Sequence, residues 1–581
     1  MHCHALRWKY IPLVFAIAIL FQFTLQAQET DEAAAKLKKE TEAKEKLARD
    51  RESRIRNFGN RSERSPDVTN VSLAAPDILC LTIQAQKLNL AKVSKYEPQP
   101  DDVKREEKHH DGVVKRAKLV RNGKELGYLQ GRNLEWLFTY ESNEGDPFLD
   151  FVADDAKIYT VTSKDDPAFA AGVKPAAVYR KSMPTNWQLT GGLAFPMRHT
   201  MYLKMPAKIQ PGKEYSIAME LPLNVRTPSV TFKADLQNVR SESVHVNQIG
   251  YRPDDTLKRA FLSVWLGTGG GCRMPDGLKF SILEDAGGKP VFSGNVECVM
   301  DVDGKEVLCA KPPKNYSNTA VYRMDFSEFK TPGKYRIFVD GIGCSYPFEI
   351  GGAMWEKAFL VQMKGLYNNR SGIELGPPYS DFKKAVDFKV DAGSVITRTT
   401  CDAMANGNED FKNIVKGDTK ESVPDAWGGY HDAGDWNPRR VSHMKTTLYQ
   451  LELVELYPSY FNSLNLNIPK ADGIPDIITE ALFEIDCFRR LQLPDGGVPY
   501  GIETDGDPGV PDVSWLSTQH AYVLAPNIRD SWYYAAAAGR AAKVLRPIKP
   551  DLAKVYEDSA VKAFNWAEAD YAKKLADKRS E

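Results

Sequence analysis

The spacing of apolar residues changes at Gly351, and this change divides the chain into two kinds of structure. Before it, short runs such as residues 335–339 alternate between apolar and polar side chains, which is typical of a strand with one buried face. After it, apolar side chains recur every three or four positions, which indicates helices with one buried face. The pattern predicts a multidomain protein in which β domains precede a helical domain. The first predicted helix face carries Trp355, Phe359, Gln362 and Leu366.

The part before Gly351 contains two β units of similar design. Each has a Pro-Gly turn, at residues 211–212 and 332–333, followed by an alternating strand at residues 215–219 and 335–339. We interpret the two units as β-sandwiches in series. Further strand-like runs, bounded by Asp, Gly, Pro and Ser, lie at residues 136–140, 158–162 and 177–180.

The first sandwich is predicted over residues 66–240 and the second over residues 241–351. The pattern of the first sandwich indicates no specific function. Its aromatic side chains could bind a polysaccharide if they are exposed, or they could pack in the core, which is the more common role of aromatic residues.

Residues 352–581 contain five predicted helices separated by loops. The second helix is expected to begin at Asn437, a capping residue, with Pro438 at its first position. Residues 370–429, before this helix, are rich in Gly, Pro, Asp, Thr and Ser, which predicts a long loop without secondary structure. Such loops are usually functional in a compact domain. The last three helices are predicted near residues 474–493, 530–546 and 551–573.

The N-terminus has the pattern of a targeting segment. A basic start, the short apolar run 11–25 and the small-residue site 26–28 predict a signal peptide over residues 1–27. The run is shorter than the about 20 residues that span a bilayer, so we expect cleavage and no integral membrane segment afterwards. The mature chain would then be secreted, to the extracellular space or the periplasm. Residues 28–65 are dense in Lys, Glu and Arg and predict a solvated, partly helical spacer.

The charge balance and the cysteine spacing argue against some classes of partner and of metal site. The chain has 77 basic and 77 acidic residues and a formal net charge of +0, so neither nucleic acid nor an anionic membrane is an expected partner. The cysteines lack the paired spacing of a zinc ribbon. Export would permit disulfides. Four cysteines lie in one region and could pair there: Cys272, Cys298, Cys309 and Cys344.

Residues 425–438 form the most informative stretch, Asp-Ala-Trp-Gly-Gly-Tyr-His-Asp-Ala-Gly-Asp-Trp-Asn-Pro. Asp432 and Asp435 are separated only by an alanine and a glycine, and such small residues let a backbone and a bulky ligand come close. Two nearby carboxylates can activate or position one water, and the aromatic rings beside them can stack on a sugar. The alternative is that both acids are surface residues at a helix start, which is common for so short a motif.

From about residue 244 to its end, the chain resembles glycoside hydrolase family 9, the cellulase family built on an (α/α)6 barrel. The resemblance implies the following fold class: a β-sandwich, an immunoglobulin-like β-sandwich over residues 241–351, and an incomplete (α/α)6 barrel over residues 352–581. The matching segments are the start of the immunoglobulin-like domain (244–253), the segment after the first barrel helix (366–373), the family signature (428–435), the helix after it (472–480) and the exit of that helix (493–497).

The resemblance also implies roles for the two acids. Asp435 corresponds to the general base and Asp432 to the residue that helps to hold the attacking water. The implied outcome is inversion, which requires the catalytic carboxyl groups to be roughly 6.5–9.5 Å apart. The family's general acid is a Glu near the C-terminal end of the barrel, in a motif that contains none of Glu480, Glu484 and Glu503.

The resemblance further implies twelve barrel helices, of which about five are predicted here. Without a general acid, hydrolysis loses the protonation of its leaving group, and an open half-barrel would expose apolar helix faces. Our hypothesis is that residues 1–581 are a partial chain that is inactive or poorly folded by itself.

Other residues near the two acids are candidates for substrate contact. His431 and Trp436 flank the acids and could line a substrate cleft or pack in the core. Trp515 could stack on a sugar. An acidic loop just before Trp515 could bind calcium, although it lacks the EF-hand pattern, and a solvated loop is the alternative. No other metal site and no required cofactor are expected. The acids of the loop are Glu503, Asp505, Asp507 and Asp512.

The leading functional hypothesis is a secreted endo-β-1,4-glucanase that hydrolyses a cellulose-type β-glucan with inversion. An exo-acting glucosidase or glucosaminidase of the same family is one alternative. A non-catalytic carbohydrate-binding protein, in which the two sandwiches do the binding, is another. The expected partner is a β-glucan or a related polysaccharide, and nothing in the sequence indicates an oligomeric state.

Overall fold

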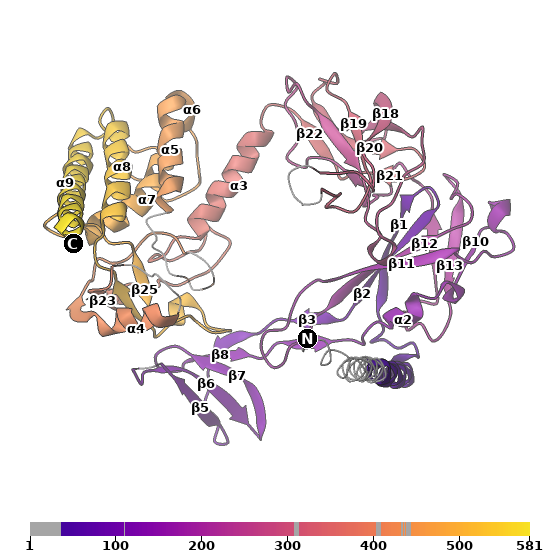
Figure 1. Ribbon diagram of the computed structural model, residues 1–581, viewed down its shortest axis with the longest axis horizontal. Coiled ribbons are helices and arrows are strands. Elements are labelled where there is room, and N and C mark those ends of the chain that lie inside the picture. Colours follow the sequence, from indigo (N-terminus) through magenta and orange to yellow (C-terminus); the bar gives the residue numbers. More distant parts are fainter. Residues whose placement is uncertain are drawn as a thin grey trace, which may run out of the picture.

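The structure is a computed structural model that describes residues 36–109, 111–306, 313–402, 408–431, 434, 436 and 443–580. Its units follow one another around a ring (Figure 1). The two β domains lie on one side, the helical domain lies on the other, and α3 (Met354–Asn368) leads from one side to the other. A separate small sheet closes the ring below. Within the described part of the chain, no helix is both long and apolar enough to cross a membrane.

The first β domain is a two-layer sandwich, as predicted. Its sheets have the strand orders β1-β2-β12-β11 and β10-β13-β14, and all pairs are antiparallel. Side chains from both sheets share one core, in which Leu81, Tyr159 and Ile217 are fully buried. The strands are β1 (Asp67–Ala75), β2 (Ile78–Ala85), β10 (Tyr159–Thr162), β11 (Ala177–Pro184), β12 (Met197–Lys204), β13 (Glu214–Met219) and β14 (Ser229–Lys233), with the short helix α2 (Asp150–Ala153).

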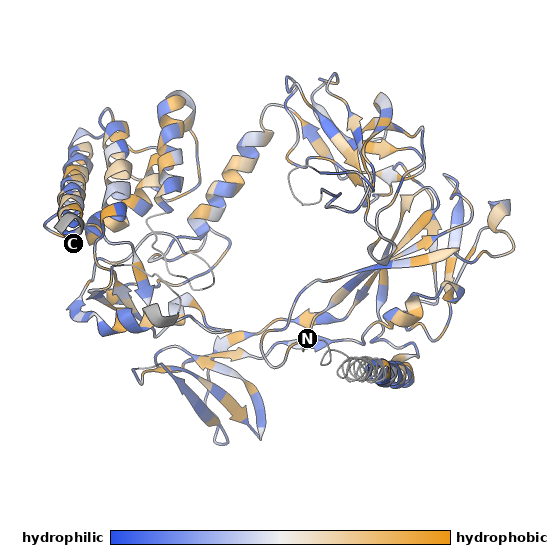
Figure 2. Cartoon of the chain, viewed as in Figure 1, coloured by the Kyte–Doolittle hydropathy of each residue, from blue (hydrophilic) through white to orange (hydrophobic). Residues whose placement is uncertain are grey.

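A second sheet is inserted between β2 and β10, and the interpretation of residues 66–240 as a single sandwich did not predict it. Its strand order is β4-β8-β7-β6-β5, and the ribbon β3-β9 connects it to the sandwich. Its core is small, centred on Ala117, Leu119 and Leu129. The outer strand β5 is mostly exposed and hydrophilic (Figure 2), so it lacks the alternation that reveals a strand. The strands are β3 (Lys87–Asn89), β4 (Val93–Lys95), β5 (Val103–Lys108), β6 (Val114–Arg121), β7 (Lys124–Gln130), β8 (Trp136–Thr139) and β9 (Ser142–Glu144).

The second β domain is also a sandwich. Its strands follow the order β15-β16-β19-β18-β17-β20-β21, and β22 pairs with β20. The long strand β18 pairs with β17 through its first half and with β19 through its second half, so it links the two layers. The strands are β15 (Val244–His245), β16 (Arg259–Leu262), β17 (Lys279–Glu284), β18 (Pro290–Met300), β19 (Val321–Asp325), β20 (Gly333–Val339), β21 (Gly343–Cys344) and β22 (Phe348–Ile350).

The alternation predicted for residues 335–339 is confirmed, because Tyr335, Ile337 and Val339 all point into the core of this domain. The core also includes Ala74 and Tyr202 of the first sandwich, so the two β domains share buried apolar surface. The disulfides that the sequence left open are not formed among the described cysteines of this region. Cys272 and Cys344 are buried thiols, Cys298 is an exposed thiol, and Cys309 lies outside the described residues.

The helical domain has α5, α7, α8 and α9 packed around one apolar core (Figure 1). The third predicted helix is confirmed as α7, in which the apolar residues Ile478, Ile485 and Phe488 are fully buried. The fourth helix begins at Ile528, a few residues before the predicted start, because Asn527 caps it by accepting a hydrogen bond from the Asp530 amide. The helices are α4 (Asn408–Lys416), α5 (Met444–Leu456), α6 (Pro458–Phe461), α7 (Asp476–Leu491), α8 (Ile528–Leu545) and α9 (Pro550–Ser580).

Two predictions for this domain are wrong in part. The predicted face of α3 is rotated, because Met354, Met363 and Tyr367 are buried while Trp355 and Gln362 are exposed. The segment 370–429 is not a structureless loop, since it contains α4 and two strands. These strands join two later ones in a sheet of order β24-β23-β26-β25, in which β23 and β26 are parallel. They are β23 (Val395–Thr399), β24 (Asp418–Ser422), β25 (Ile502–Thr504) and β26 (His520–Val523).

The charged segment near the N-terminus is more ordered than a solvated spacer. A helix spans residues 36–58, and its first part is exposed. Its last turns pack on the first sandwich, where Ile55 and Phe58 contact the apolar core. Arg54 donates a hydrogen bond of 2.9 Å to the carbonyl oxygen of Phe148. Apolar contacts and a side-chain hydrogen bond therefore dock the end of this helix on the sandwich.

Replacing Ile337 by Ala should destabilise the second β domain by about 2–5 kcal/mol, because the truncation leaves a cavity in a packed core. The control is Val299→Ala on β18, where the side chain is exposed and the expected loss is below about 0.5 kcal/mol. Thermal unfolding of the full chain, followed by calorimetry, measures both. Equal midpoints for the two variants would contradict the assignment of Ile337 to the core.

Candidate functional site

The backbone of the Gly-Gly-Tyr-His stretch runs antiparallel to the segment that follows α3. Arg370 and Tyr430 form an isolated β-bridge. The Ser371 amide donates to the carbonyl oxygen of Gly429 over 2.9 Å, and the His431 amide donates to that of Asn369 over 2.8 Å. Two separate parts of the family resemblance therefore lie side by side, the segment after α3 at residues 369–371 and the described start of the signature at residues 429–431.

Glycine is required at this crossing. Gly372 and Gly428 both have positive φ, at 75° and 98°. A Cβ on Gly372 would lie 2.7 Å from the amide nitrogen of Gly428, and a Cβ on Gly428 would lie 3.0 Å from the Arg490 guanidinium. Real Cβ atoms do not approach backbone this closely, so a larger residue at Gly372 would push the two segments apart.

A buried ion pair anchors the same crossing to α7. Arg370 donates from Nε and Nη2 to the two carboxylate oxygens of Glu480, over 3.2 and 3.0 Å. The Tyr430 hydroxyl donates to Glu480 Oε1 over 2.8 Å. The Arg370 side chain is 7% exposed and the Glu480 side chain 0%. Charges this deeply buried must be paired and hydrogen-bonded. Because the Tyr430 hydroxyl donates to the same carboxylate, the ion pair also holds the Tyr430 side chain in place.

His431 is held on both ring nitrogens. Its Nε2 lies 2.9 Å from Asp387 Oδ2, and its Nδ1 lies 2.7 Å from the carbonyl oxygen of Trp436. A carbonyl and an ionised carboxylate only accept hydrogen bonds. The contacts on both ring nitrogens therefore hold the imidazole in one orientation, one residue before Asp432.

Asp387 gathers donors from several segments. Lys384 Nζ lies 2.9 Å from its Oδ2, the Ser514 hydroxyl donates to Oδ2 over 2.6 Å, and the Gly372 amide donates to Oδ1 over 2.8 Å. Burial alone would raise the pKa of Asp387, but the hydrogen bond from His431 and the charge of Lys384 hold it well below its ordinary value. The carboxyl is therefore ionised across the physiological range.

The sequence-predicted site residues are only partly visible in the structure. Asp432 and Asp435 lie outside the described residues, as do Asn437 and Pro438 of the predicted cap. Trp436 is half-buried, packs against the helical core and has φ of 58°, a conformation that is uncommon for an aromatic residue. The described part of α5 spans Met444–Leu456, and the predicted start of this helix lies outside the described residues.

Trp515 is 38% exposed. It directly follows Ser514, whose hydroxyl donates a hydrogen bond to Asp387. Trp427, which was not predicted as a site residue, lies 3.9 Å from the Arg490 guanidinium carbon and 5.4 Å from Lys389 Nζ. Asp387, Lys384 and Ser514 were not predicted either. Each is a single polar residue in a loop, and no short motif marks such residues.

The three glutamates considered in the sequence are all buried. Glu480 is committed to Arg370, and Glu503 lies in β25 with its Oε1 accepting from the Thr504 amide. Glu484 is fully enclosed on α7, where burial raises its pKa to about 8 against a smaller opposing effect of the Tyr430 backbone. None of the three is assigned here as a proton donor to a substrate.

The acidic loop before Trp515 is not simply solvated. Asp512 is paired with Arg116 at 2.9 Å and with Lys115 at 3.2 Å, and its side chain is only 10% exposed. Two cations already occupy the position that a calcium ion would need beside this carboxylate. Among the described residues, no three His, Cys, Asp or Glu side chains are arranged to hold a metal ion.

The fold and the site together define a multidomain protein in which two β domains precede a helical domain, with the candidate site in the loop before α5. Residues 239–344 match the family described as the cellulase N-terminal ig-like domain. The chain is 26% identical over 325 residues to endoglucanase D of Acetivibrio thermocellus. The matched region covers 54% of this chain and 43% of that protein. Residues 239–344 are therefore similar to the immunoglobulin-like domain that precedes cellulase domains, and a longer part of the chain is similar to an endoglucanase.

Two further relatives were found. The chain is 24% identical over 336 residues to the xyloglucan-specific endo-β-1,4-glucanase BoGH9A of Bacteroides ovatus, covering 57% of this chain and 50% of that protein. It is 25% identical to a solved metagenome-derived glycoside hydrolase family 9 endoglucanase, with a TM-score of 0.45 and coverage of 56% and 54%. The chain spans about half the length of the curated relatives it matches.

Replacing Glu484 by Gln should stabilise the helical domain at neutral pH. The folded-state pKa of about 8 lies above the unfolded value of 4.5, so the folded state binds the extra proton and stability falls as pH rises between these values. The substitution removes this loss, which is on the order of 3 kcal/mol at pH 7.

Unfolding midpoints of both proteins from pH 4 to pH 9 test this expectation. The advantage of the variant should be absent near pH 4, grow up to about pH 8 and then level off. The matched control is Glu557→Gln on α9, where the side chain is 45% exposed. A difference between wild type and Glu484→Gln that does not change with pH would contradict the raised pKa.

Proposed function

We propose that this chain binds a β-1,4-glucan and supplies the water-activating side of an inverting glycoside hydrolase site. The observation that supports this most directly is the fixed placement of His431, which is bonded on both ring nitrogens and directly precedes Asp432. This placement holds the backbone that leads into the segment of the two acids, and a general base acts only from a defined position beside its water.

In the proposed reaction Asp435 takes a proton from a water molecule held with the help of Asp432. The water oxygen forms a bond to the anomeric carbon as the glycosidic carbon–oxygen bond breaks on the opposite face of the sugar. The leaving oxygen takes a proton from a general acid. No residue of 1–581 is assigned this last role, and no cofactor is needed for any of the steps.

Because no acid is assigned, we expect residues 1–581 to cleave only substrates whose leaving group departs without a proton. A dinitrophenyl β-cellobioside provides such a leaving group, whereas cellohexaose does not. We predict release of dinitrophenolate by the wild-type chain and a loss of about 10²–10⁴-fold in Asp435→Asn. The first-formed sugar should be the α anomer, measured by proton NMR.

The outcomes of this experiment are distinct. Equal rates for wild type and Asp435→Asn would refute the role of Asp435. Turnover of cellohexaose by residues 1–581 would refute the assumption that the acid is absent from them. A higher rate on the corresponding β-glucosaminide would favour the glucosaminidase alternative over the glucanase.

The second candidate function, carbohydrate binding by the first sandwich, is supported by one specific observation. The hairpin between β11 and β12 carries a cluster of exposed apolar side chains, and such exposed patches often mark binding sites. The tryptophan of this cluster, Trp187, is 55% exposed, which suits stacking on a sugar. The exposed residues are Trp187, Leu189, Leu193 and Phe195.

Binding of cellohexaose to the full chain separates the two candidate sites. If the glucan binds at the loop before α5, Trp436→Ala should weaken the affinity about tenfold or more while Trp187→Ala leaves it unchanged. Isothermal titration calorimetry measures both. The reverse result would support the non-catalytic function of the sandwich and contradict the proposal.

A further inference from the structure

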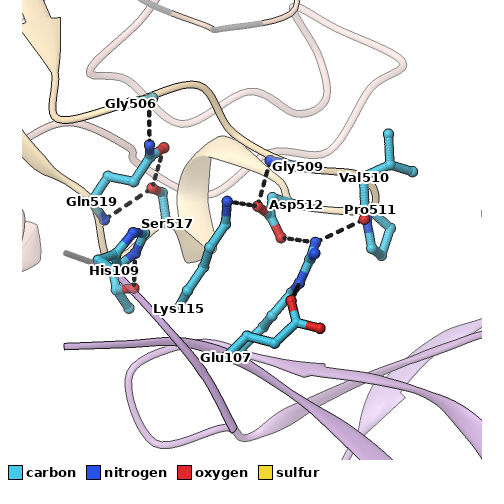
Figure 3. Close-up of polar contacts among 12 residues, drawn as sticks. Glu107, His109, Lys115, Gly506, Gly509, Val510, Pro511, Asp512, Ser517 and Gln519 are labelled. Carbon is cyan, nitrogen blue, oxygen red and sulfur yellow. Dashed lines mark hydrogen bonds and ion pairs between the residues drawn. The ribbon is translucent and has the colours of Figure 1, made fainter. Parts of the chain in front are cut away.

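The inserted sheet meets the helical domain through a partly buried ion pair (Figure 3). Arg116 on β6 donates from Nη1 to Asp512 Oδ1 over 2.9 Å and to the carbonyl oxygen of Val510 over 2.7 Å. Lys115 Nζ lies 3.2 Å from the other oxygen of Asp512. The side chains of Arg116 and Asp512 are 13% and 10% exposed, so their attraction is less screened than that of a surface pair.

Arg116 is itself held in place from the side of the sheet. Glu107 on β5 accepts from its Nε over 2.6 Å. Burial would lower the pKa of Arg116, but Asp512 and Glu107 raise it above its ordinary value, so the guanidinium keeps its charge in the interface. The sheet therefore presents a pre-oriented cation to the loop of the helical domain.

Further contacts follow the same loop on both sides of Asp512. Gln130 Nε2 donates to the carbonyl oxygen of Pro511 over 3.0 Å. The hydroxyl of Thr518 lies 3.0 Å from His109 Nε2 and donates to the carbonyl oxygen of Val114 over 2.9 Å. The inserted sheet thus contacts the loop between β25 and β26 near its middle and near its end.

This loop reaches the candidate site. Ser514, two residues after Asp512, donates to Asp387 over 2.6 Å, and Asp387 contacts His431 over 2.9 Å. Asp387 belongs to a segment that the inserted sheet also meets, because the Arg132 guanidinium lies against Gly393, where a Cβ would be 2.1 Å from Nη1. The loop that carries Ser514 and the segment that carries Asp387 therefore both contact the inserted sheet.

We propose that Arg116 is a positioning residue for the glycan-binding site: through Asp512 it sets the loop of residues 505–519, and through Ser514 and Asp387 that loop sets the orientation of His431. The expected loss of glycan affinity rests on the proposed function. The expected loosening of the loop and of His431 is independent of that function.

The test uses the full chain and compares Arg116→Ala with Arg105→Ala. Arg105 lies on the neighbouring strand of the same sheet, and its pair with Glu125 is exposed to solvent. Hydrogen–deuterium exchange without ligand should rise about tenfold for residues 505–519 and for 426–431 in Arg116→Ala, and for neither in Arg105→Ala. Ser514→Ala should raise exchange in 426–431 but much less in 505–513.

Two further variants separate positioning from a general loss of structure. Arg116→Lys keeps the charge and should restore most of the protection. Asp512→Asn removes the same contact from the side of the loop and leaves the inserted sheet intact. It should show the exchange changes expected for Arg116→Ala, and it provides the test if Arg116→Ala fails to fold. Unchanged exchange in 426–431 for both Arg116→Ala and Asp512→Asn would overturn the proposal.

The ligand experiment addresses the consequence for the site. The affinity for cellohexaose should fall about tenfold in Arg116→Ala and in Ser514→Ala, with little further loss in the double variant, because both act on the same contact. Fully additive losses would overturn the proposed route through Ser514. If the wild-type chain binds no glucan, the proposed function fails, while the exchange measurements still decide the positioning role.

Discussion

The side chains of Arg370 and Glu480 form an ion pair inside the helical domain, and the arrangement of the candidate site depends on it. Arg370 comes from the segment after α3, Glu480 comes from α7, and Tyr430 of the signature donates to the same carboxylate. A charge enclosed by protein must be matched in position as well as in sign. The ion pair therefore holds three segments that are distant in the sequence in one arrangement. This arrangement positions the backbone before Asp432.

Asp387 performs a second and different task. It accepts from Lys384, Ser514 and the Gly372 amide and contacts His431, so its two oxygens are shared among four partners. The orientation of His431 consequently depends on loops as well as on helices. Since one of these loops rests on the inserted sheet, residues near the beginning of the chain become part of the surroundings of the site.

Some features of this arrangement were predictable because their signals are local. The buried face of α7 follows from an apolar period that Ile478, Ile485 and Phe488 repeat within one helix. The inward alternation of β20 is equally local. By contrast, β23 has only five residues and pairs in parallel with β26, more than a hundred positions later, so its stability comes from a partner that the local pattern does not contain. The face of α3 was misplaced because apolar residues occur on both sides of that helix.

The sequence by itself indicated the order of the domains, the resemblance to glycoside hydrolase family 9 and the two acids, Asp432 and Asp435, on which the proposed chemistry depends. These features reside in short contiguous segments whose spacing carries the information. Only the tertiary structure showed that Arg116 contacts the loop of Ser514, and that Ser514 contacts Asp387 beside His431. Each is a single polar residue in a loop or on a polar strand, and its role comes from the partner that folding brings within hydrogen-bonding distance.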